Sequence, residues 1–243
     1  MNKVNIELKR GIGNRFFIIM ILLGGLNVLF GYILLVTVNE MPQFTFGDFV
    51  AATYSVYSLF AIFIFSPIII SQFYTDYKGK NIMFYKSLNY SALRYYISKV
   101  FMILIGTIMG GIVSTLLICA PFGKFDFFLI VFLKIEAIMS FYSITVSFWG
   151  FVFHNFLAAF FTNLIVWFIG IIISMQSTSL RIFAYYDSST LDYKRFIDFL
   201  QGKIGLKSFF YNIGENYLFN IIVFISIAVL VKVLEKRWIK NGI

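Results

Sequence analysis

The sequence predicts an all-α protein that crosses a membrane several times. Of the 243 residues, 60% are hydrophobic and 13% are charged, whereas a globular chain is closer to half apolar and a quarter charged. The apolar residues form runs of about twenty, long enough to cross the hydrocarbon core as helices. The cations gather at the ends of these runs, as in proteins that keep positive loops in the cytoplasm. We therefore expect one transmembrane domain over residues 1–243, with six spans and both termini on the cytoplasmic side of the cell membrane.

Residues 1–15 are basic and predict a segment that lies on the cytoplasmic surface. Val4, Leu8 and Ile12 are spaced at four, which puts an apolar stripe on one side of an interfacial helix. Two glycines weaken that helix, so an irregular basic tail is the alternative. The first span follows from Phe16 to about Val38.

The second span runs from about Phe49 to Phe73, after a loop at 39–48 that carries acids but no Lys or Arg. Such a loop is expected outside. Pro67 removes one backbone hydrogen bond from the span, so we expect a kink there.

Residues 74–99 form the only long basic interval between two early apolar runs. It holds one acid, Asp76, against five cations, which are Lys78, Lys80, Lys86, Arg94 and Lys99. This balance places the interval in the cytoplasm. Apolar and aromatic residues between the break at Gly79 and the turn at Asn89 predict a short helix over 80–88. A solvated basic loop is the plain interpretation, and a helix that docks on a partner is the functional one.

The third span runs from about Val100 to Ala120 and carries Gly106, Gly110 and Ser114 at spacings of four. Small residues at this spacing let two helices approach closely in lipid. We expect packing within the bundle, with a contact between subunits as the alternative.

The fourth span lies within 126–153, and a short inner turn at His154 leads to a fifth span over 156–175. Counting back from that turn puts Lys134 and Glu136 near the outer headgroups, where their charges reach water. At the bilayer centre each charge would cost about 2.5–3.5 kcal/mol, which favours the outer placement.

The fourth span carries a small polar stripe, formed by Ser140, Ser143 and Ser147. Hydrogen bonds between helices are the plain interpretation of this stripe, and the lining of a substrate cavity is the alternative.

Residues 176–216 form an outer segment by the count of crossings, although they hold five cations. Four acids offset these cations, and the positive-inside rule is weaker for longer loops. Ser189 and Asp192 resemble a capping box before an apolar set with helical spacing, and a second such set follows Gly205. We expect two short amphipathic helices here, before a sixth span over 217–234 with a basic end.

Several chemistries are excluded by what the sequence lacks. One cysteine, Cys119, and one histidine, His154, cannot form a disulfide or a multi-ligand metal site within the chain. No HExxH motif or paired intramembrane acids suggest a membrane hydrolase. The net charge of +9 follows membrane topology rather than a phosphate-binding stripe, so we expect no nucleic-acid partner.

The chain as a whole resembles the permease subunits of ABC-2-type transporters. The resemblance lies in the amphipathic start, the six spans, the basic loop, the short inner turn and the amphipathic segments before the last span. In that family the loop often carries an acid, a nearby glycine, a short coupling helix, a serine turn and then a lysine that opens the third helix. The matching positions here are Asp76, Gly79, Ser91 and Lys99. Lys80 and Asn89 depart from the pattern.

The resemblance implies a permease that works as one of a pair, docked on separate ATPase subunits that bind ATP and magnesium. The residues it implies for ATPase coupling are Asp76, Tyr77, Lys78, Gly79, Phe84, Tyr85, Lys86 and Leu88. The chain itself has no P-loop, because GKN at Gly79 and GKI at Gly202 lack the hydroxyl residue and the upstream glycine. We therefore expect no enzyme activity and no cofactor in this chain.

Within that family, the small size and the 32 Phe and 15 Tyr make the chain most similar to permeases for peptide toxins, such as phenol-soluble modulin exporters and lantibiotic-immunity transporters. A cavity walled by Phe, Met and Ile suits an amphipathic peptide, although lipid-facing positions explain the Phe count equally well. Lipids, drugs or polysaccharide are the alternative cargoes. A channel or an immunity scaffold that needs no ATPase is the alternative class.

Overall fold

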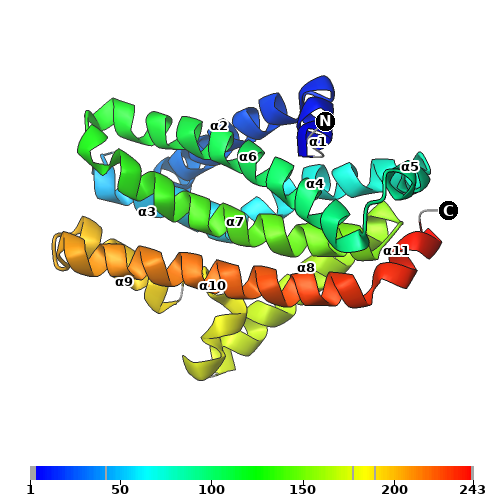
Figure 1. Ribbon diagram of the computed structural model, residues 1–243. Coiled ribbons are helices and arrows are strands. Elements are labelled where there is room, and N and C mark those ends of the chain that lie inside the picture. The colour runs from blue at the N-terminus through cyan, green and yellow to red at the C-terminus, as the bar shows by residue number, and fades with distance from the viewer. Residues whose placement is uncertain (1–3, 42, 177, 189, 242–243) are drawn as a thin grey trace.

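The computed structural model describes residues 4–41, 43–176, 178–188 and 190–241, and its described elements are all helical. Its long helices lie side by side along one axis (Figure 1). Both chain ends lie at the same end of this bundle, which we call the basic end. The basic end carries three short helices, α1 (Val4–Gly13), α5 (Ile82–Ser87) and α11 (Glu235–Asn241). The opposite end carries α9 (Leu191–Leu200).

The number of spans agrees with the hydropathy pattern. Five described helices are long and apolar enough to cross a membrane: α2 (Phe16–Ile33), α6 (Ala92–Cys119), α7 (Phe128–Val152), α8 (Phe156–Gln176) and α10 (Leu206–Val233). A bent pair, α3 (Phe46–Leu59) and α4 (Ala61–Lys78), makes a sixth if it is counted as one span. A π-helical turn (Leu34–Val38) and 3₁₀ turns (Ala120–Phe122, Phe125–Phe127 and Thr178–Ala184) lie at helix ends. The all-α, multi-span prediction is confirmed.

The bend in the second span lies at Phe60, where α3 and α4 meet at 49°, and not at Pro67. The expected kink at Pro67 is therefore wrong in position, because α4 continues through that residue. The two halves pack on different neighbours: α3 contacts α2, whereas α4 contacts α8, and both contact α7. A break between them lets each half follow its own partner.

Close packing of α2 on α6 accounts for the small residues predicted in the third span. A Cβ atom added at Gly110 would lie 2.6 Å from the carbonyl oxygen of Met20, and one at Gly24 would lie 2.8 Å from Ser114 Oγ. At Gly106 the added atom would lie 2.6 Å from the Phe16 ring. The structure thus places Gly106, Gly110 and Ser114 against α2 of the same chain.

Two predicted boundaries at helix starts are wrong. The third span begins at Ala92, with the hydroxyl of Ser91 accepting from the Arg94 amide at 3.3 Å, so Lys99 lies two turns inside α6 rather than at its start. The second amphipathic outer helix and the sixth span are one continuous helix, α10. Since nothing after Gly205 breaks the helical path until Leu234, the apolar set at 206–213 forms the first turns of that span.

The N-terminal helix forms as α1, and the apolar stripe on it stays a prediction: Ile12 is 69% exposed, as a side chain that faces the membrane surface would be. The side of α1 that faces α6 instead carries Glu7 and Gly11, both buried. The side chain of Val4 lies outside the described residues. A carboxylate at the buried side of a helix needs a partner inside the protein, and for Glu7 this partner is Lys99 of α6.

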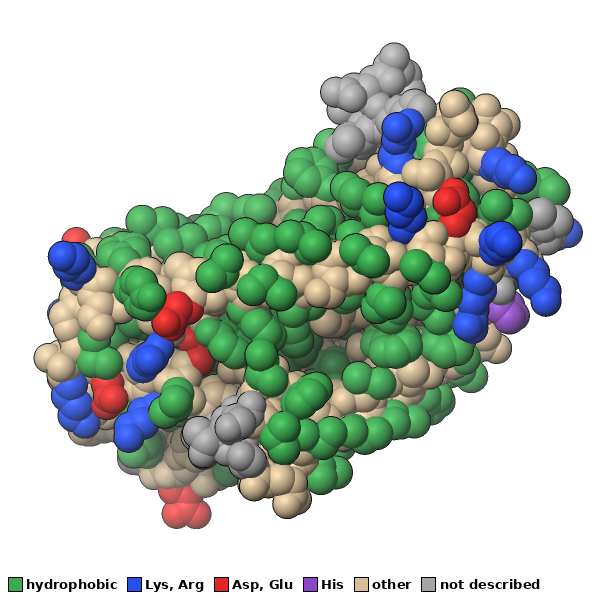
Figure 2. Space-filling model, turned by 60° about the horizontal axis from the view of Figure 1, so that its bottom comes forward, with side chains coloured by type: hydrophobic (Ala, Val, Ile, Leu, Met, Phe, Trp, Pro, Cys, Tyr) green, Lys and Arg blue, Asp and Glu red, His purple; other side chains and the backbone are tan. Residues whose placement is uncertain are grey.

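The surface follows the pattern of a membrane protein. Figure 2 shows hydrophobic side chains over the middle of the molecule and charged ones gathered at its two ends. Most side chains of α8 and α10 point outward.

Candidate functional site

A buried network of charges holds the short helix α5 at the basic end. Lys99 Nζ lies 2.7 Å from a Glu7 oxygen and 2.8 Å from an Asp76 oxygen. Arg10 Nη2 lies 2.5 Å from the other Asp76 oxygen. Two acids and two cations thus neutralise each other where α1, α4 and α6 meet, as buried charges require.

Tyr85 connects α5 to this network. Its hydroxyl donates to Glu7 and accepts from Arg10. Burial, with the nearby carboxylates of Asp76 and Glu7, raises the pKa of Tyr85, so the hydroxyl keeps its proton and remains a donor. Asn81, just before α5, donates to Asp76 at 3.2 Å. The position of α5 is therefore set by side chains of two other helices, α1 and α4.

The residues that the family resemblance implied for coupling fall into two groups. Asp76, Tyr77 and Tyr85 are buried, and Tyr77 donates to the Phe151 carbonyl at 2.5 Å. The polar atoms of these three are therefore engaged inside the chain, and their role in coupling stays a prediction. Lys78, Gly79, Phe84 and Lys86 are exposed, and Leu88 is half-buried. Met83, which the sequence analysis did not single out, is 52% exposed, and Phe84 is 55% exposed.

Withdrawal of Glu7 and Asp76 into the network leaves a surface that is more basic than the sequence suggests. The exposed charges of α4, α5 and the turn between them at this end are all cations, namely Lys78, Lys80 and Lys86. Figure 2 shows blue side chains clustered at the same end of the molecule as the single histidine. His154 is exposed in the turn between α7 and α8, as the sequence indicated.

The serine stripe is largely buried. Ser143 and Ser147 are fully buried, and Ser140 donates to Glu136 at 3.4 Å. The lining of a substrate cavity by this stripe stays a prediction. The stripe lies on the inner side of α7. The helices α4, α6 and α10 pack against α7.

An aromatic cleft lies beside another face of α7, the one that carries Phe141, Thr145 and Phe148. It has a volume of about 180 Å³, and its walls come from α4, α7, α8, α10 and the 3₁₀ turn 178–184. Phe141, Phe148, Trp149 and Trp167 give it an apolar surface, and Thr145 and Asn163 add polar points. The sequence could not indicate this cleft, because its residues come from five segments.

A second buried network lies toward the opposite end. Lys134 Nζ donates to Asp192 at 2.6 Å, Asn216 at 2.8 Å and Asn212 at 3.0 Å, which uses all three of its protons. Tyr54 donates to the second Asp192 oxygen at 3.0 Å. The prediction that Lys134 and Glu136 reach water is wrong, because α9 and α10 cover Lys134 and both residues are buried.

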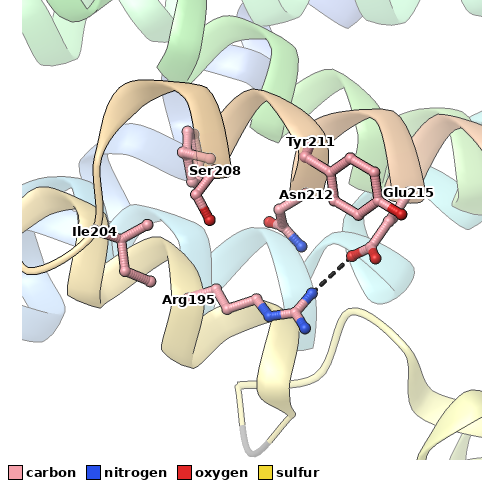
Figure 3. Close-up of a pocket in the computed structure, with 7 residues that line it drawn as sticks. Arg195, Ile204, Ser208, Tyr211, Asn212 and Glu215 are labelled. Atoms are coloured by element: carbon pink, nitrogen blue, oxygen red, sulfur yellow. Dashed lines mark hydrogen bonds and ion pairs between the residues drawn. The ribbon is translucent and has the colours of Figure 1, made fainter.

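The predicted capping box of α9 is replaced by this network. The carboxylate of Asp192 binds Lys134 rather than a backbone amide, and the preceding Thr190 makes no side-chain cap. Ser189 lies outside the described residues. A pocket of about 140 Å³ beside the network contains the Arg195–Glu215 ion pair, at 2.6 Å, and Asn212 (Figure 3).

The described residues contain no group of three or more His, Cys, Asp or Glu that could hold a metal ion. The arrangement that the structure does contain is a bundle of apolar helices, charge networks near both ends, and a short helix that presents apolar side chains at one end. These features define a polytopic membrane protein.

Comparison with known proteins gives the family. The model of the YydJ family, described as peptide export permease proteins, matches residues 4–243, and this chain belongs to that family. A curated relative, the probable peptide export permease protein YydJ of Bacillus subtilis (strain 168), is 23% identical over 249 residues, which cover 99% of this chain and 100% of the relative. No solved structure matches the chain.

Proposed function

We propose that this chain is the permease subunit of an ATP-driven exporter that carries amphipathic or hydrophobic peptides across the cell membrane. The family and the name of the curated relative support peptide export. The resemblance to ABC-2-type permeases supports ATP as the source of energy, supplied by a separate ATPase subunit that binds ATP and magnesium. The basic end then faces the cytoplasm, in line with its exposed cations.

The observation that carries the proposal is the construction of α5. This helix has only six residues, too few to be stable alone, yet the network at Tyr85 fixes it at the end of the bundle. Met83 and Phe84 remain exposed on it. A helix fixed on one side and apolar on the other is suited to enter a groove of a partner.

The same network gives a route for movement. Displacement of α5 acts on Glu7 of α1 through Tyr85, and on Lys99 of α6 through Glu7 and Asp76. Closure of an ATPase pair on ATP therefore shifts the spanning helices through α1 and α6. The ATPase changes the conformation of the permease only by binding its two states with different affinity.

We propose a peptide cargo because the helices that form the walls of the aromatic cleft are apolar. Aromatic walls with sparse polar groups suit apolar side chains of a peptide. We propose that two copies of the chain form the complete translocation path, since α8 and α10 bury little of their surface within one copy.

Copurification tests the proposal. The tagged chain is extracted in mild detergent from the cells that naturally produce it, and the proteins isolated with it are identified by mass spectrometry. We expect the ATPase to copurify and its turnover to change in the complex. The double change Met83→Ala and Phe84→Ala should reduce the copurified ATPase without reducing membrane insertion.

A matched control is Phe125→Ala, because Phe125 is 54% exposed at the other end of the bundle. This variant should retain the ATPase as the unmodified chain does. ATP-driven uptake of a labelled amphipathic peptide into inverted vesicles, whose cytoplasmic face is outside, then tests the cargo class. Peptide movement that is independent of ATP and of the ATPase would favour a channel and contradict the proposal.

A further inference from the structure

The C-terminal helix α11 lies beside α5 and forms a groove with it. The groove, which we call the α5–α11 groove, is lined by Ile82, Met83, Lys86, Ser87 and Ile239 and has a volume of about 300 Å³. Its floor is apolar, while Lys86 lies on its edge. Residues more than 150 positions apart in the chain therefore form one surface at the basic end.

Packing fixes α11 in this place. Trp238 is 1% exposed, and its ring lies 5.3 Å from the ring of Tyr95 in α6. The Glu235 carboxylate accepts from the Ala92 amide at 3.3 Å, at the first turn of α6. The acid of α11 thus caps a neighbouring helix, where the helix dipole favours a negative charge. Ile239 is then left beside α5, facing the groove.

Lys86 is the charged residue that lines the groove, and the exposed charges on the elements that flank it are cations. Three exposed cations come from α4, α5 and the turn between them, and three more from α11: Lys78, Lys80, Lys86, Lys236, Arg237 and Lys240. The acids of the same elements, Asp76 and Glu235, are respectively buried in the charge network and bound to the start of α6. An apolar floor inside a cationic rim is complementary to an apolar side chain that projects from an acidic surface.

We propose that α11 is the second wall of the docking site for the ATPase subunit, and that the partner inserts an apolar side chain into the α5–α11 groove from an acidic face. This inference rests on the proposed function and adds a partner surface to it. A protein partner fits the groove better than anionic lipid does, because a bilayer surface offers cations a plane of charge but no projecting side chain for an apolar recess. The proposed contact with the ATPase thus involves both α5, which lies between the second and third spans, and α11 near the end of the chain.

The test measures binding of the purified ATPase subunit, identified by its copurification with the permease, to the full permease in nanodiscs of neutral lipid. Ile239→Asp places a negative charge on the groove floor and should weaken binding about tenfold or more, as loss of a central interface residue does. Lys86→Glu should weaken it as well and reduce its dependence on salt. Val233→Asp is the matched control, since Val233 is 74% exposed, lies six residues before Ile239 and does not line the groove.

The outcomes separate the two proposals. Wild-type binding by both Ile239→Asp and Lys86→Glu would overturn the groove while leaving the proposed function intact. Equal weakening by Ile239→Asp and Val233→Asp would show a general charge effect and would also overturn it. Absence of ATPase binding to the unmodified permease would contradict the proposed function itself.

Hydrogen exchange provides a second readout that does not depend on a variant. Amides in 82–87 and 235–240 should gain protection when the ATPase is added in neutral nanodiscs. Protection that instead requires phosphatidylglycerol in the nanodisc and does not increase with the ATPase would assign this surface to lipid headgroups.

Discussion

Lys134 of α7 and Asp192 of α9 form an ion pair at 2.6 Å with both side chains buried. The pair joins a spanning helix to a short helix at the end of the bundle opposite the termini. Asn212 and Asn216 of α10 complete the hydrogen bonding of both partners. The position of α9 therefore depends on a fully bonded pair of charges rather than on its apolar face alone.

Removal of one partner should be costly. Lys134→Met leaves the Asp192 carboxylate buried without a cation, and breaking a buried pair in this way destabilises a protein by about 3–5 kcal/mol. Unfolding of the chain in detergent, followed by circular dichroism, measures the change. Lys203→Met is the control: its 65% exposed side chain lies 3.7 Å from Asp198, and such surface pairs contribute about 0–1 kcal/mol. Equal stability of the two variants would contradict a structural role for the buried pair.

The contact of α2 with α6 should not accept a methyl group at Gly110. A Cβ atom there would lie 2.6 Å from a backbone oxygen of Met20, and overpacking of this kind costs about 1–3 kcal/mol. We expect Gly110→Ala to lower the unfolding temperature. Gly214→Ala is the comparison, because nothing lies within 4 Å of the added atom, and Ala favours a helix over Gly by about 0.5–1 kcal/mol. A neutral result at position 110 would show that the helices separate easily.

The hydroxyl of Tyr85 should control the attachment of α1. Tyr85→Phe removes the bonds to Glu7 and Arg10, and an unsatisfied buried polar partner costs about 1–3 kcal/mol. We expect faster amide exchange in α1, measured by mass spectrometry, with the spanning helices unchanged. Tyr211→Phe, at a site 73% exposed, should have no such effect. Unchanged exchange of α1 in the Tyr85 variant would indicate that the ion pairs of Lys99 hold this helix without α5.

Glu136 offers a test of an unpaired acid. Its Oε1 accepts from Thr107 at 2.9 Å, while Oε2 has no hydrogen-bond partner among the described residues. Glu136→Gln retains the shape and removes the ionisable group, so we expect stability equal to or higher than that of the unmodified chain. Loss of peptide export in a stably folded Glu136→Gln variant would assign this carboxyl a role in transport.

Sidedness can be tested by cysteine labelling in a Cys119→Ala background. Lys80 and Lys203 are both exposed, at the basic and opposite ends respectively. A reagent that does not cross the membrane should label a cysteine at 203 in intact cells and one at 80 only after the cells are opened. The reverse labelling pattern would place the basic end outside.

The sequence predicts the spans and the short helix well because these depend on local composition. A run of apolar residues defines α2 or α8, and the break at Gly79 with the turn at Asn89 defines α5. The partners of buried charges cannot be predicted in the same way. Nothing near Lys134 in the chain indicates an acid 58 residues later, so a placement in water was the reasonable expectation. Likewise, the pattern marks Tyr85 as an apolar helical residue but cannot show that Glu7 approaches it.

Errors at element ends have a related cause. Amphipathic spacing at 206–213 is typical of an interfacial helix, and it also fits the first turns of a longer one when α9 covers the polar side. The serine stripe on α7 was assigned correctly to one helix face, but only the arrangement of the neighbouring helices decides whether that face is open. Both cases need tertiary contacts that a single sequence does not contain.

The two spans that leave the basic charge network differ mechanically. Helix α6 has 28 residues without interruption, which makes it a rod about 42 Å long at 1.5 Å per residue. A push on Lys99 must tilt or slide this rod as a whole, so its far end at Cys119 moves too. The neighbouring span is jointed at Phe60, so a push on Asp76 can be absorbed there while α3 stays in place. In the proposed mechanism, a single stroke at one membrane face would then displace the two far ends by unequal amounts.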